Sequence, residues 1–248
     1  MSLSNQHQLN GFNRLAPFYD LLSYLVFGGA IQRAQLHGLT FLKGDEHVWM
    51  IGGGTGWALS QYLKKHPQLT ITYIEASSKM IELAQKKLTP QQEQRVRWIH
   101  STHEWIYQNP QEVNACDGLI TFFFLDVLNP KELELFFDWV DQHQGPKTKT
   151  NRPWIWLFAD FCPHPSPWKM HFVSFMYWCF RWATGLKNKT LSPYPKMFSK
   201  RGWTLLTQND LKKRTQLQPK KNSSLSQQNS SYVLKTKKLI QSRVYYRA

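Results

Sequence analysis

Residues His47 to Gly56 read His-Val-Trp-Met-Ile-Gly-Gly-Gly-Thr-Gly, and this stretch determines the fold that we predict. The apolar residues 48–51 predict a short strand, and from Ala58 onward apolar residues recur at helical spacing, so a helix is expected just after the glycines. The glycines allow a ligand to contact the backbone, and the N-terminus of the helix offers unpaired N–H groups with roughly half a positive charge. The stretch therefore predicts a site for an anionic or nucleoside-bearing ligand.

The following strand favours a nucleoside. Residues 70–74 predict a second strand that ends on Glu75, about 20 residues after the glycines. An acidic side chain at that place can bind both hydroxyls of a ribose. Ser77 is suited to cap the helix that follows, and Met80 begins the apolar stripe of that helix.

The spacing of the glycines distinguishes two kinds of cofactor. A dinucleotide fingerprint, Gly-x-Gly-x-x-Gly, requires its third glycine where Trp57 stands. The spacing present, Gly52-x-Gly54-x-Gly56, resembles the first motif of class I S-adenosylmethionine-dependent methyltransferases, hydrophobic-Asp-Ile-Gly-x-Gly-Thr-Gly. The resemblance implies S-adenosylmethionine as the cofactor, although Met50 stands where that family usually has an acidic residue. A glycine-rich turn without a ligand is the structural alternative.

A second resemblance lies near the N-terminus. Residues 12–20, Phe-Asn-Arg-Leu-Ala-Pro-Phe-Tyr-Asp, are similar to the Phe-Asp-x-x-Ala-x-x-Tyr-Asp segment of methyltransferases akin to the ubiquinone/menaquinone biosynthesis enzymes. In that group the segment lies across the cofactor site, which implies that Tyr19 contacts the methionine part of the cofactor. Alternatively, the aromatic residues pack on the sheet from an N-terminal helix. Residues 21–39 predict two helices of a cap, broken at Gly28-Gly29.

Two further strands are expected to bring side chains to the same edge of the sheet. After a strand over residues 96–100, the family often places a contact to adenine; here Ser101 and Thr102 are weak candidates, and His103 is expected at the surface. Residues 119–125 form an apolar run typical of a buried parallel strand. Because ligands bind at the carboxyl edge of open α/β sheets, we expect the crevice to be bordered by Phe123, Phe124 and Asp126. Asp126 could instead cap the next helix, predicted from Pro130 to Asp141.

The second half of the chain predicts a lid and a closing pair of strands. Residues 154–160 predict a strand, and a proline-rich loop follows over 161–167. Residues 168–184 are apolar almost all round and would span roughly 25 Å as a helix, too short to cross a membrane. We interpret them as a buried lid helix, with a helix in a membrane interface as the alternative. Residues 200–206 and 238–247 predict the two closing strands, which class I methyltransferases pair as an antiparallel hairpin.

The charge of +15 is unevenly distributed. Residues 1–186 carry 16 basic and 15 acidic side chains, a net +1, whereas residues 187–248 carry 15 basic and one acidic, a net +14. The basic part could contact an anionic membrane surface or a polyanion, or keep the protein soluble. Three scattered cysteines without metal-ligand spacing indicate a reducing compartment, and the polar N-terminus lacks the pattern of a signal peptide. We therefore expect a cytoplasmic protein, with peripheral contact at the inner membrane surface left open.

The acceptor of the methyl group is less determined. Methyl transfer from a sulfonium is an in-line displacement, so positioning can supply most of the acceleration, and a base is needed only if the acceptor must lose a proton. Candidate bases are Asp126, Asp160, His164 and His171; none has a motif behind it, so the catalytic residue stays unassigned. The apolar lid and the aromatic content favour a small, aromatic or lipid-like acceptor. Left open are methylation of RNA through the basic part, binding of S-adenosylmethionine without catalysis, and a nicotinamide-dependent oxidoreductase, against which Trp57 argues.

We therefore predict one α/β domain over residues 1–248, a doubly wound and mostly parallel sheet of seven strands. It comprises an N-terminal helical cap (1–44), a cofactor-binding core with the lid helix (45–186) and a basic C-terminal part with the closing strands (187–248). Stretches ending at Asp126, Phe161 and Leu186 also resemble small, mostly uncharacterised bacterial methyltransferases. No metal is expected, and the oligomeric state is not predicted. The residues predicted to bind S-adenosylmethionine are Tyr19, Gly52, Gly53, Gly54, Thr55, Gly56, Glu75, Ala76, Met80, Thr102, Phe123, Phe124 and Asp126.

Overall fold

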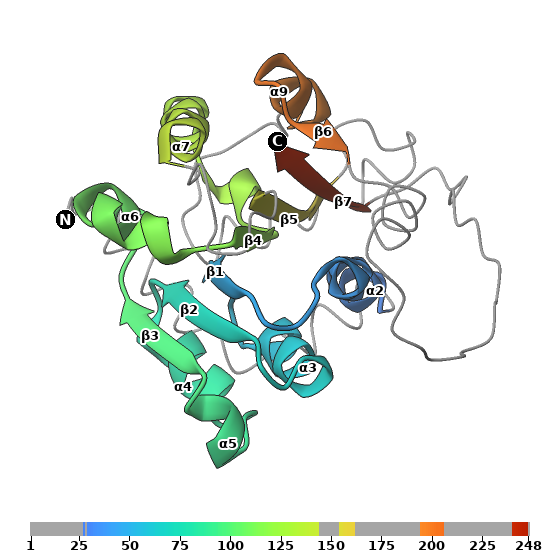
Figure 1. The fold of residues 1–248 in the computed structure, drawn as a ribbon, viewed down its shortest axis with the longest axis vertical. Coiled ribbons are helices and arrows are strands. Elements are labelled where there is room, and N and C mark those ends of the chain that lie inside the picture. The colour runs from blue at the N-terminus through green and yellow to red at the C-terminus, as the bar shows by residue number, and fades with distance from the viewer. Residues whose placement is uncertain (1–26, 28, 144–153, 162–193, 206–239, 248) are drawn as a thin grey trace, which may run out of the picture.

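The computed structural model describes residue 27 and residues 29–143, 154–161, 194–205 and 240–247. These residues form a central seven-stranded sheet with helices on both faces (Figure 1). The strands are β1 (His47–Ile51), β2 (Thr70–Glu75), β3 (Val96–His100), β4 (Gly118–Phe122), β5 (Trp154–Phe161), β6 (Thr204–Leu205) and β7 (Ile240–Arg247). The α-helices are α2 (Ala30–His37), α3 (Trp57–Lys65), α4 (Ser78–Gln85), α5 (Pro90–Glu93), α6 (Trp105–Gln108), α7 (Pro130–His143) and α9 (Tyr194–Lys200). The 3-10 helices within the described residues are η1 (Gly38–Phe41), η2 (Pro110–Ala115) and η3 (Leu125–Val127).

The strand order identifies the kind of sheet. The strands lie in the order β3-β2-β1-β4-β5-β7-β6, with β1 to β5 parallel and β7 antiparallel to both β5 and β6. The order reverses between β1 and β4, which is where ligands bind in open α/β sheets. The order is typical of class I methyltransferases, and the predicted seven-stranded, mostly parallel fold with its closing antiparallel pair is confirmed.

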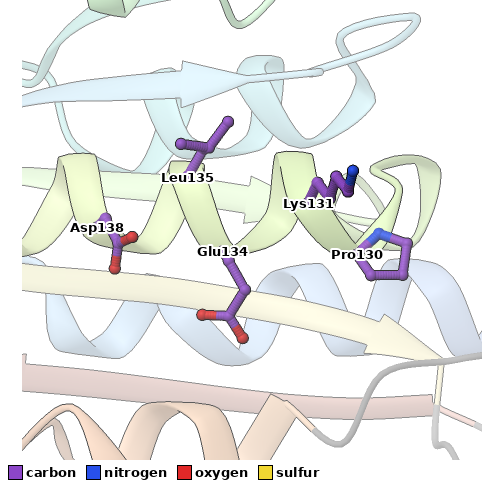
Figure 2. Close-up of a pocket in the computed structure, with 5 residues that line it drawn as sticks. All are labelled: Pro130, Lys131, Glu134, Leu135 and Asp138. Carbon is purple, nitrogen blue, oxygen red and sulfur yellow. The ribbon is translucent and has the colours of Figure 1, made fainter.

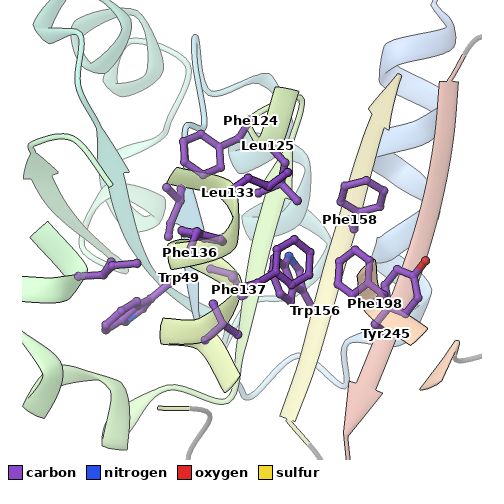
Figure 3. Packing of buried hydrophobic residues seen from close by; sticks show 14 of the residues in the cluster. Trp49, Phe124, Leu125, Leu133, Phe136, Phe137, Trp156, Phe158, Phe198 and Tyr245 are labelled. Atoms are coloured by element: carbon purple, nitrogen blue, oxygen red, sulfur yellow. The ribbon is translucent and has the colours of Figure 1, made fainter. Parts of the chain in front are cut away.

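The sheet separates two hydrophobic clusters. On one face, Trp156 and Phe158 of β5 pack with Phe137 of α7 and with α9, as the close-up of this cluster shows (Figure 3). On the other face, Leu157 of β5 packs in the cluster that includes Tyr62 of α3. Alternate residues of β5 thus serve opposite cores, which is why this strand is apolar almost throughout. Burial on both faces fixes the register of β5 and so places its carboxyl end.

The predicted fourth strand was too long. β4 ends at Phe122 and not at residue 125, because Phe123 has a backbone φ of 55° that no regular strand allows. The backbone N–H of Phe123 still donates to the carbonyl oxygen of Ala159, at 2.7 Å. The chain then turns into η3, so the residues after β4 lie across the edge of the sheet.

Asp126 does not cap α7, so the alternative role considered for it is wrong. Asn129 lies immediately before α7, and its Oδ1 accepts hydrogen bonds from the backbone N–H groups of Lys131 and Glu132, at 2.9 and 3.0 Å. Glu132 in turn accepts from the N–H of Asn129, at 2.8 Å. This reciprocal pair is a capping box, in which Asp126 takes no part.

Several predictions fall outside the described residues or concern elements with weak sequence signals. Tyr19, the first cap helix and the lid helix over 168–184 lie outside the described residues, and α2 is the described part of the cap. Helices α5, α6 and α9 were not predicted, because each has fewer than eight residues and little helical periodicity. Within the described ranges, no helix is both long enough and apolar enough to cross a membrane.

Candidate active site

The glycine-rich loop follows β1 at the carboxyl edge of the sheet. Gly52, Gly54 and Gly56 all have positive φ values, of 66°, 64° and 76°, which side chains disfavour. The N–H of Gly52 donates to the carbonyl oxygen of Ile74, at 2.9 Å, so the loop leaves the sheet beside the end of β2. Helix α3 begins directly after Gly56. The predicted strand, glycine turn and helix are all present in this order.

The carboxylate of Glu75 holds the middle of this loop. Its Oε2 accepts a hydrogen bond from the N–H of Gly54 at 3.0 Å, and its Oε1 accepts one from the N–H of Ser77 at 2.9 Å. A Cβ atom at Gly54 would meet no heavy atom of the described residues within 4 Å. One side of Gly54 is therefore bound to β2, and the other side is open for a ligand.

Burial raises the pKa of Glu75 above its ordinary value, although the N–H groups of Ser77 and Gly54 favour the charged form. A carboxylate that is shielded from water and already oriented by two N–H groups interacts strongly with a neutral hydroxyl donor. This environment fits the predicted contact between Glu75 and ribose hydroxyls.

The loop after β2 leads into α4. Ser77 caps this helix as predicted, since its Oγ accepts from the N–H of Met80 at 3.1 Å. Met80 is buried, whereas Ala76 and Thr102 are half-buried at the ends of β2 and β3. The Nε2 of His100 donates to the carbonyl oxygen of Ala76 at 3.1 Å and ties these two strand ends together.

The residues after β4 return to the glycine loop. A Cβ at Gly52 would lie 2.7 Å from the ring of Phe124, so this ring covers the start of the loop. Phe124 contacts His103 edge-on, with ring centroids 5.8 Å apart. The expectation that His103 lies at the surface is wrong: it is half-buried among aromatic rings, and burial lowers its pKa. The lowered pKa favours the neutral form of His103, whose ring contacts Phe124.

Two carboxyl groups interact here: that of Asp126 in η3, after β4, and that of Asp160, one residue before the end of β5. Asp160 is fully buried, and its Oδ1 accepts from its neighbour Phe161, at 2.8 Å from the backbone nitrogen. Burial and, after it, the negative charge of Asp126 raise the pKa of Asp160 well above its ordinary value. Of the four candidate bases, the structure brings these two together; His164 and His171 lie outside the described residues.

Comparison with known proteins identifies the domain. Residues 48–146 match the model of a family described as "Methyltransferase domain". The chain carries a class I S-adenosylmethionine-dependent methyltransferase domain. The predicted methyltransferase domain is thereby confirmed, and domains of this class bind S-adenosylmethionine.

The similarity to curated proteins is partial. The chain is 34% identical over 87 residues to demethylmenaquinone methyltransferase of Thermotoga maritima, an alignment that covers 34% of the chain and 38% of that relative. It is 36% identical over 78 residues to malonyl-[acyl-carrier protein] O-methyltransferase of Priestia megaterium, covering 32% of the chain and 28% of that relative. Each alignment thus spans well under half of the relative's own length.

A solved structure shares the fold of the methyltransferase domain. The complex of DhpI with S-adenosylhomocysteine superposes with a TM-score of 0.54 at 15% identity, covering 83% of this chain and 91% of that chain. At this level of identity the likeness concerns the fold alone.

The residues present in the methyltransferase domain fit this cofactor. The open side of Gly54 allows close approach to the backbone, and Glu75 supplies an oriented carboxylate. Thr55 is buried, and its carbonyl oxygen accepts from Lys87 Nζ at 2.7 Å, so the turn that follows α4 also holds the loop. Among the described residues, no group of three or more His, Cys, Asp or Glu side chains could hold a metal ion.

Sequence reasoning missed one residue that contacts the glycine loop, Tyr73. Its hydroxyl donates to the carbonyl oxygen of Gly54 at 2.7 Å, from a position two residues before Glu75 on β2. The signal was a polar aromatic residue on the same face of the strand as the acidic one. Met50, the departure from the family motif, is buried in the cluster that also contains Tyr73.

A surface hollow of about 550 Å³ lies away from these residues, on the outer side of α7. Its five lining residues, Pro130, Lys131, Glu134, Leu135 and Asp138, all belong to that helix (Figure 2). None of the predicted site residues lines it. The chemistry therefore points to the carboxyl edge of the sheet and not to this hollow.

Proposed function

We propose that residues 1–248 form one methyltransferase domain that transfers the methyl group of S-adenosylmethionine to a small, aromatic or lipid-like acceptor. In this proposal the backbone of residues 52–56 supports the cofactor and Glu75 binds its ribose. The other predicted contacts come from the segments that follow β2, β3 and β4 and from the N-terminal segment: Ala76, Met80, Thr102, Phe123, Phe124, Asp126 and Tyr19. The oriented carboxylate beside an open glycine supports this assignment.

The observation that carries the acceptor class is a row of three phenylalanine rings. Phe123 follows β4 and Phe161 ends the neighbouring strand β5, and their ring centroids are 5.1 Å apart. The ring of Phe27 continues the row, with its centroid 5.4 Å from that of Phe161. Phe123 is half-buried, whereas Phe27 and Phe161 are buried. Ligand sites are lined predominantly by apolar and aromatic side chains with a few polar groups, and such a wall favours an acceptor with a flat or apolar body.

In methyl transfer the main contribution of the protein is to position the acceptor and the methyl group. When bound, S-adenosylmethionine supplies a methyl group on a sulfonium, which departs as a neutral thioether once the acceptor attacks in line. The chain's own part is to hold the acceptor against the cofactor, and effective molarities of about 10⁵–10⁸ M show how far positioning can accelerate a reaction. If the acceptor is a hydroxyl, Asp126 and Asp160 are the carboxyl groups at the edge that could take its proton. We assign the step to neither.

The test is an acceptor screen with purified protein and S-adenosylmethionine labelled in the methyl group. The panel contains small phenols and quinols, fatty acids and phospholipids, and RNA, and transferred label is counted and the product identified by mass spectrometry. Label on an apolar small molecule supports the proposal. Label on RNA alone would overturn the acceptor class. Binding of the cofactor without transfer to any acceptor, including extracts from cells, would favour a non-catalytic binding protein.

A paired variant connects the acceptor class to the row of rings. Phe161→Ala removes the central ring, and we expect it to raise KM for the acceptor while the Kd of S-adenosylmethionine stays within twofold. Leu135→Ala is the control, because Leu135 is an exposed apolar side chain on α7. Equal KM values for the two variants would contradict the role of the rings.

We further propose that the protein works in the cytoplasm and that residues 187–248 contact an anionic surface, either a membrane or a polyanion. The charge of +14 in this part supports this proposal. Binding to anionic vesicles and to RNA is measured at increasing salt, since counterion release makes such affinities fall steeply with salt. Affinity for neither surface at low salt would leave solubility as the role of the charge.

A further inference from the structure

We propose that Tyr73 is a positioning residue for the cofactor-binding loop: with Glu75 it fixes the backbone of Gly54, in place of the acidic residue that is absent at position 50. This inference rests on the proposed binding of S-adenosylmethionine to the loop.

The first support is that β2 holds both polar backbone groups of Gly54. The Tyr73 hydroxyl donates to its carbonyl oxygen at 2.7 Å, and Glu75 Oε2 accepts from its N–H at 3.0 Å. Residues 73 and 75 are two apart on one strand, so their side chains leave the same face of the sheet. Two hydrogen bonds of opposite polarity, from one rigid strand, restrict rotation about both bonds that flank the α-carbon of Gly54.

The second support is the position of the Tyr73 ring under Gly53. A Cβ atom at Gly53 would lie 2.2–2.6 Å from three atoms of the Tyr73 ring and hydroxyl, which no real contact allows. Tyr73 is fully buried, and its ring meets Trp98 edge-on at a centroid distance of 5.0 Å. The ring is therefore immobilised on its far side and supports the loop on its near side. This contact explains why the variable position between Gly52 and Gly54 of the motif is also a glycine, Gly53, in this chain.

The third support comes from the register of β1 and β2. Met50 is the direct neighbour of Tyr73 in the parallel pair, and both belong to the same hydrophobic cluster. Met50 is only 2% exposed, and its thioether is at best a weak hydrogen-bond acceptor. The hydroxyl that reaches the loop thus comes from the strand beside position 50. A loop held in this way loses little conformational freedom when a ligand binds, which favours affinity.

The experiment compares Tyr73→Phe with Tyr62→Phe. Tyr62 is an equally buried tyrosine, and its hydroxyl donates to the backbone carbonyl oxygen of Gln35 in α2 at 2.8 Å, not to the glycine loop. Each variant loses one buried hydroxyl with the same kind of partner, so the loss of stability is matched. Affinities for S-adenosylmethionine and S-adenosylhomocysteine are measured by calorimetry, together with thermal unfolding.

We expect Tyr73→Phe to weaken the binding of both ligands about five- to tenfold, the effect of one neutral hydrogen bond, while Tyr62→Phe binds as the wild type does. Amide hydrogen exchange distinguishes a local loosening of the loop from a general loss of stability, because the two variants are matched in stability. In the absence of ligand, the amides of residues 52–56 should exchange faster in Tyr73→Phe than in Tyr62→Phe.

Three outcomes overturn the inference in distinguishable ways. Equal affinities in all three proteins would show that Tyr73 does not position the loop, and the proposed function would stand. Equal losses in both variants, with equal exchange at residues 52–56, would assign the effect to global stability. Failure of the folded wild-type protein to bind either ligand would remove the proposed function and this inference with it.

Discussion

Gly56 lies directly against Ala84 of α4. A Cβ atom at Gly56 would be 2.4 Å from the Cβ of Ala84 and 2.7 Å from its Cα, closer than real atoms approach. Because the Cα of Ala84 belongs to the backbone of α4, it cannot move aside as a flexible side chain could. The end of the glycine loop is therefore packed against α4 with no space for a side chain, whereas Gly54 faces open space.

This contrast predicts different effects of alanine at the two glycines. Gly56→Ala should lower the free energy of unfolding by about 2–5 kcal/mol, combining a left-handed backbone conformation with overpacking. Gly54→Ala carries only the conformational part, about 1–2 kcal/mol. Urea unfolding of both variants measures the difference. Because the added methyl group would lie on the open side of the loop, Gly54→Ala should nevertheless lose S-adenosylmethionine binding in calorimetry. Equal destabilisation of the two variants would contradict the packing described here.

Glu75→Gln tests the contact to the ribose. The amide keeps the size of the side chain but removes its charge and one of its two acceptors. We expect the Kd of S-adenosylmethionine to rise about 10- to 150-fold, which corresponds to 1.5–3 kcal/mol for hydrogen bonds to a charged group. Glu82→Gln is the control, since Glu82 is an exposed acidic residue of α4 that pairs with Lys79. A Glu75→Gln protein that binds as tightly as the control would exclude Glu75 from the site.

Asp160 predicts a pH dependence of stability. Burial and the charge of Asp126 raise its pKa in the folded protein above 3.8, the ordinary value that applies to the unfolded chain. At a pH between the ordinary and the raised pKa, the folded state therefore holds more protons than the unfolded state. The free energy of unfolding therefore falls as pH rises through that window, and the loss persists at higher pH. Asp160→Asn cannot ionise, and its Oδ1 can still accept from the N–H of Phe161. The variant should thus gain stability relative to the wild type as pH increases from 4 to 8, measured by thermal unfolding.

Asp126→Asn supplies the matched control for this pH dependence. Removing the charge of Asp126 removes one of the two causes that raise the pKa of Asp160. The fall in stability should then still begin near pH 3.8 but end at lower pH than in the wild type and be smaller, while Asp160 itself remains titratable. A pH profile that is unchanged in both variants would mean that the pair does not titrate in the folded protein.

Met50→Asp tests whether the motif residue of the family can be restored. Met50 is buried among apolar residues beside Tyr73, and the N–H of Gly54 is already bonded to Glu75. A carboxylate introduced there is buried without a partner in the loop, and we expect a loss of about 3–5 kcal/mol in the free energy of unfolding. Met50→Leu keeps the apolar volume and should change it by less than about 1.5 kcal/mol. Stronger cofactor binding by a stable Met50→Asp protein would show that position 50 still faces the site.

The parts of the fold that the sequence predicted well have local causes. Ser77 caps α4 because its hydroxyl reaches the N–H three residues later, and the residues of β2 before Glu75 are all β-branched or aromatic, which favours a strand. Such signals need only neighbouring residues. The end of β4 was misplaced because Phe123 adopts a left-handed conformation that its residue type does not favour. The same limit applies to His103, whose aromatic neighbours include Phe124 and Phe136 from later in the chain.

By itself, the sequence determined the cofactor class: the glycine spacing, the acidic end of the second strand and the apolar runs identify a class I S-adenosylmethionine-dependent methyltransferase domain. Only the tertiary structure decided which side chains hold the glycine loop. It packed the Tyr73 ring against Gly53, let the Glu75 carboxylate accept from the N–H of Gly54, and brought the charge of Asp126 near Asp160. These pairs lie about 20 to 34 residues apart in the chain. They meet because strand order and register align the carboxyl ends of β1, β2, β4 and β5 at one edge of the sheet, and no local pattern encodes that alignment.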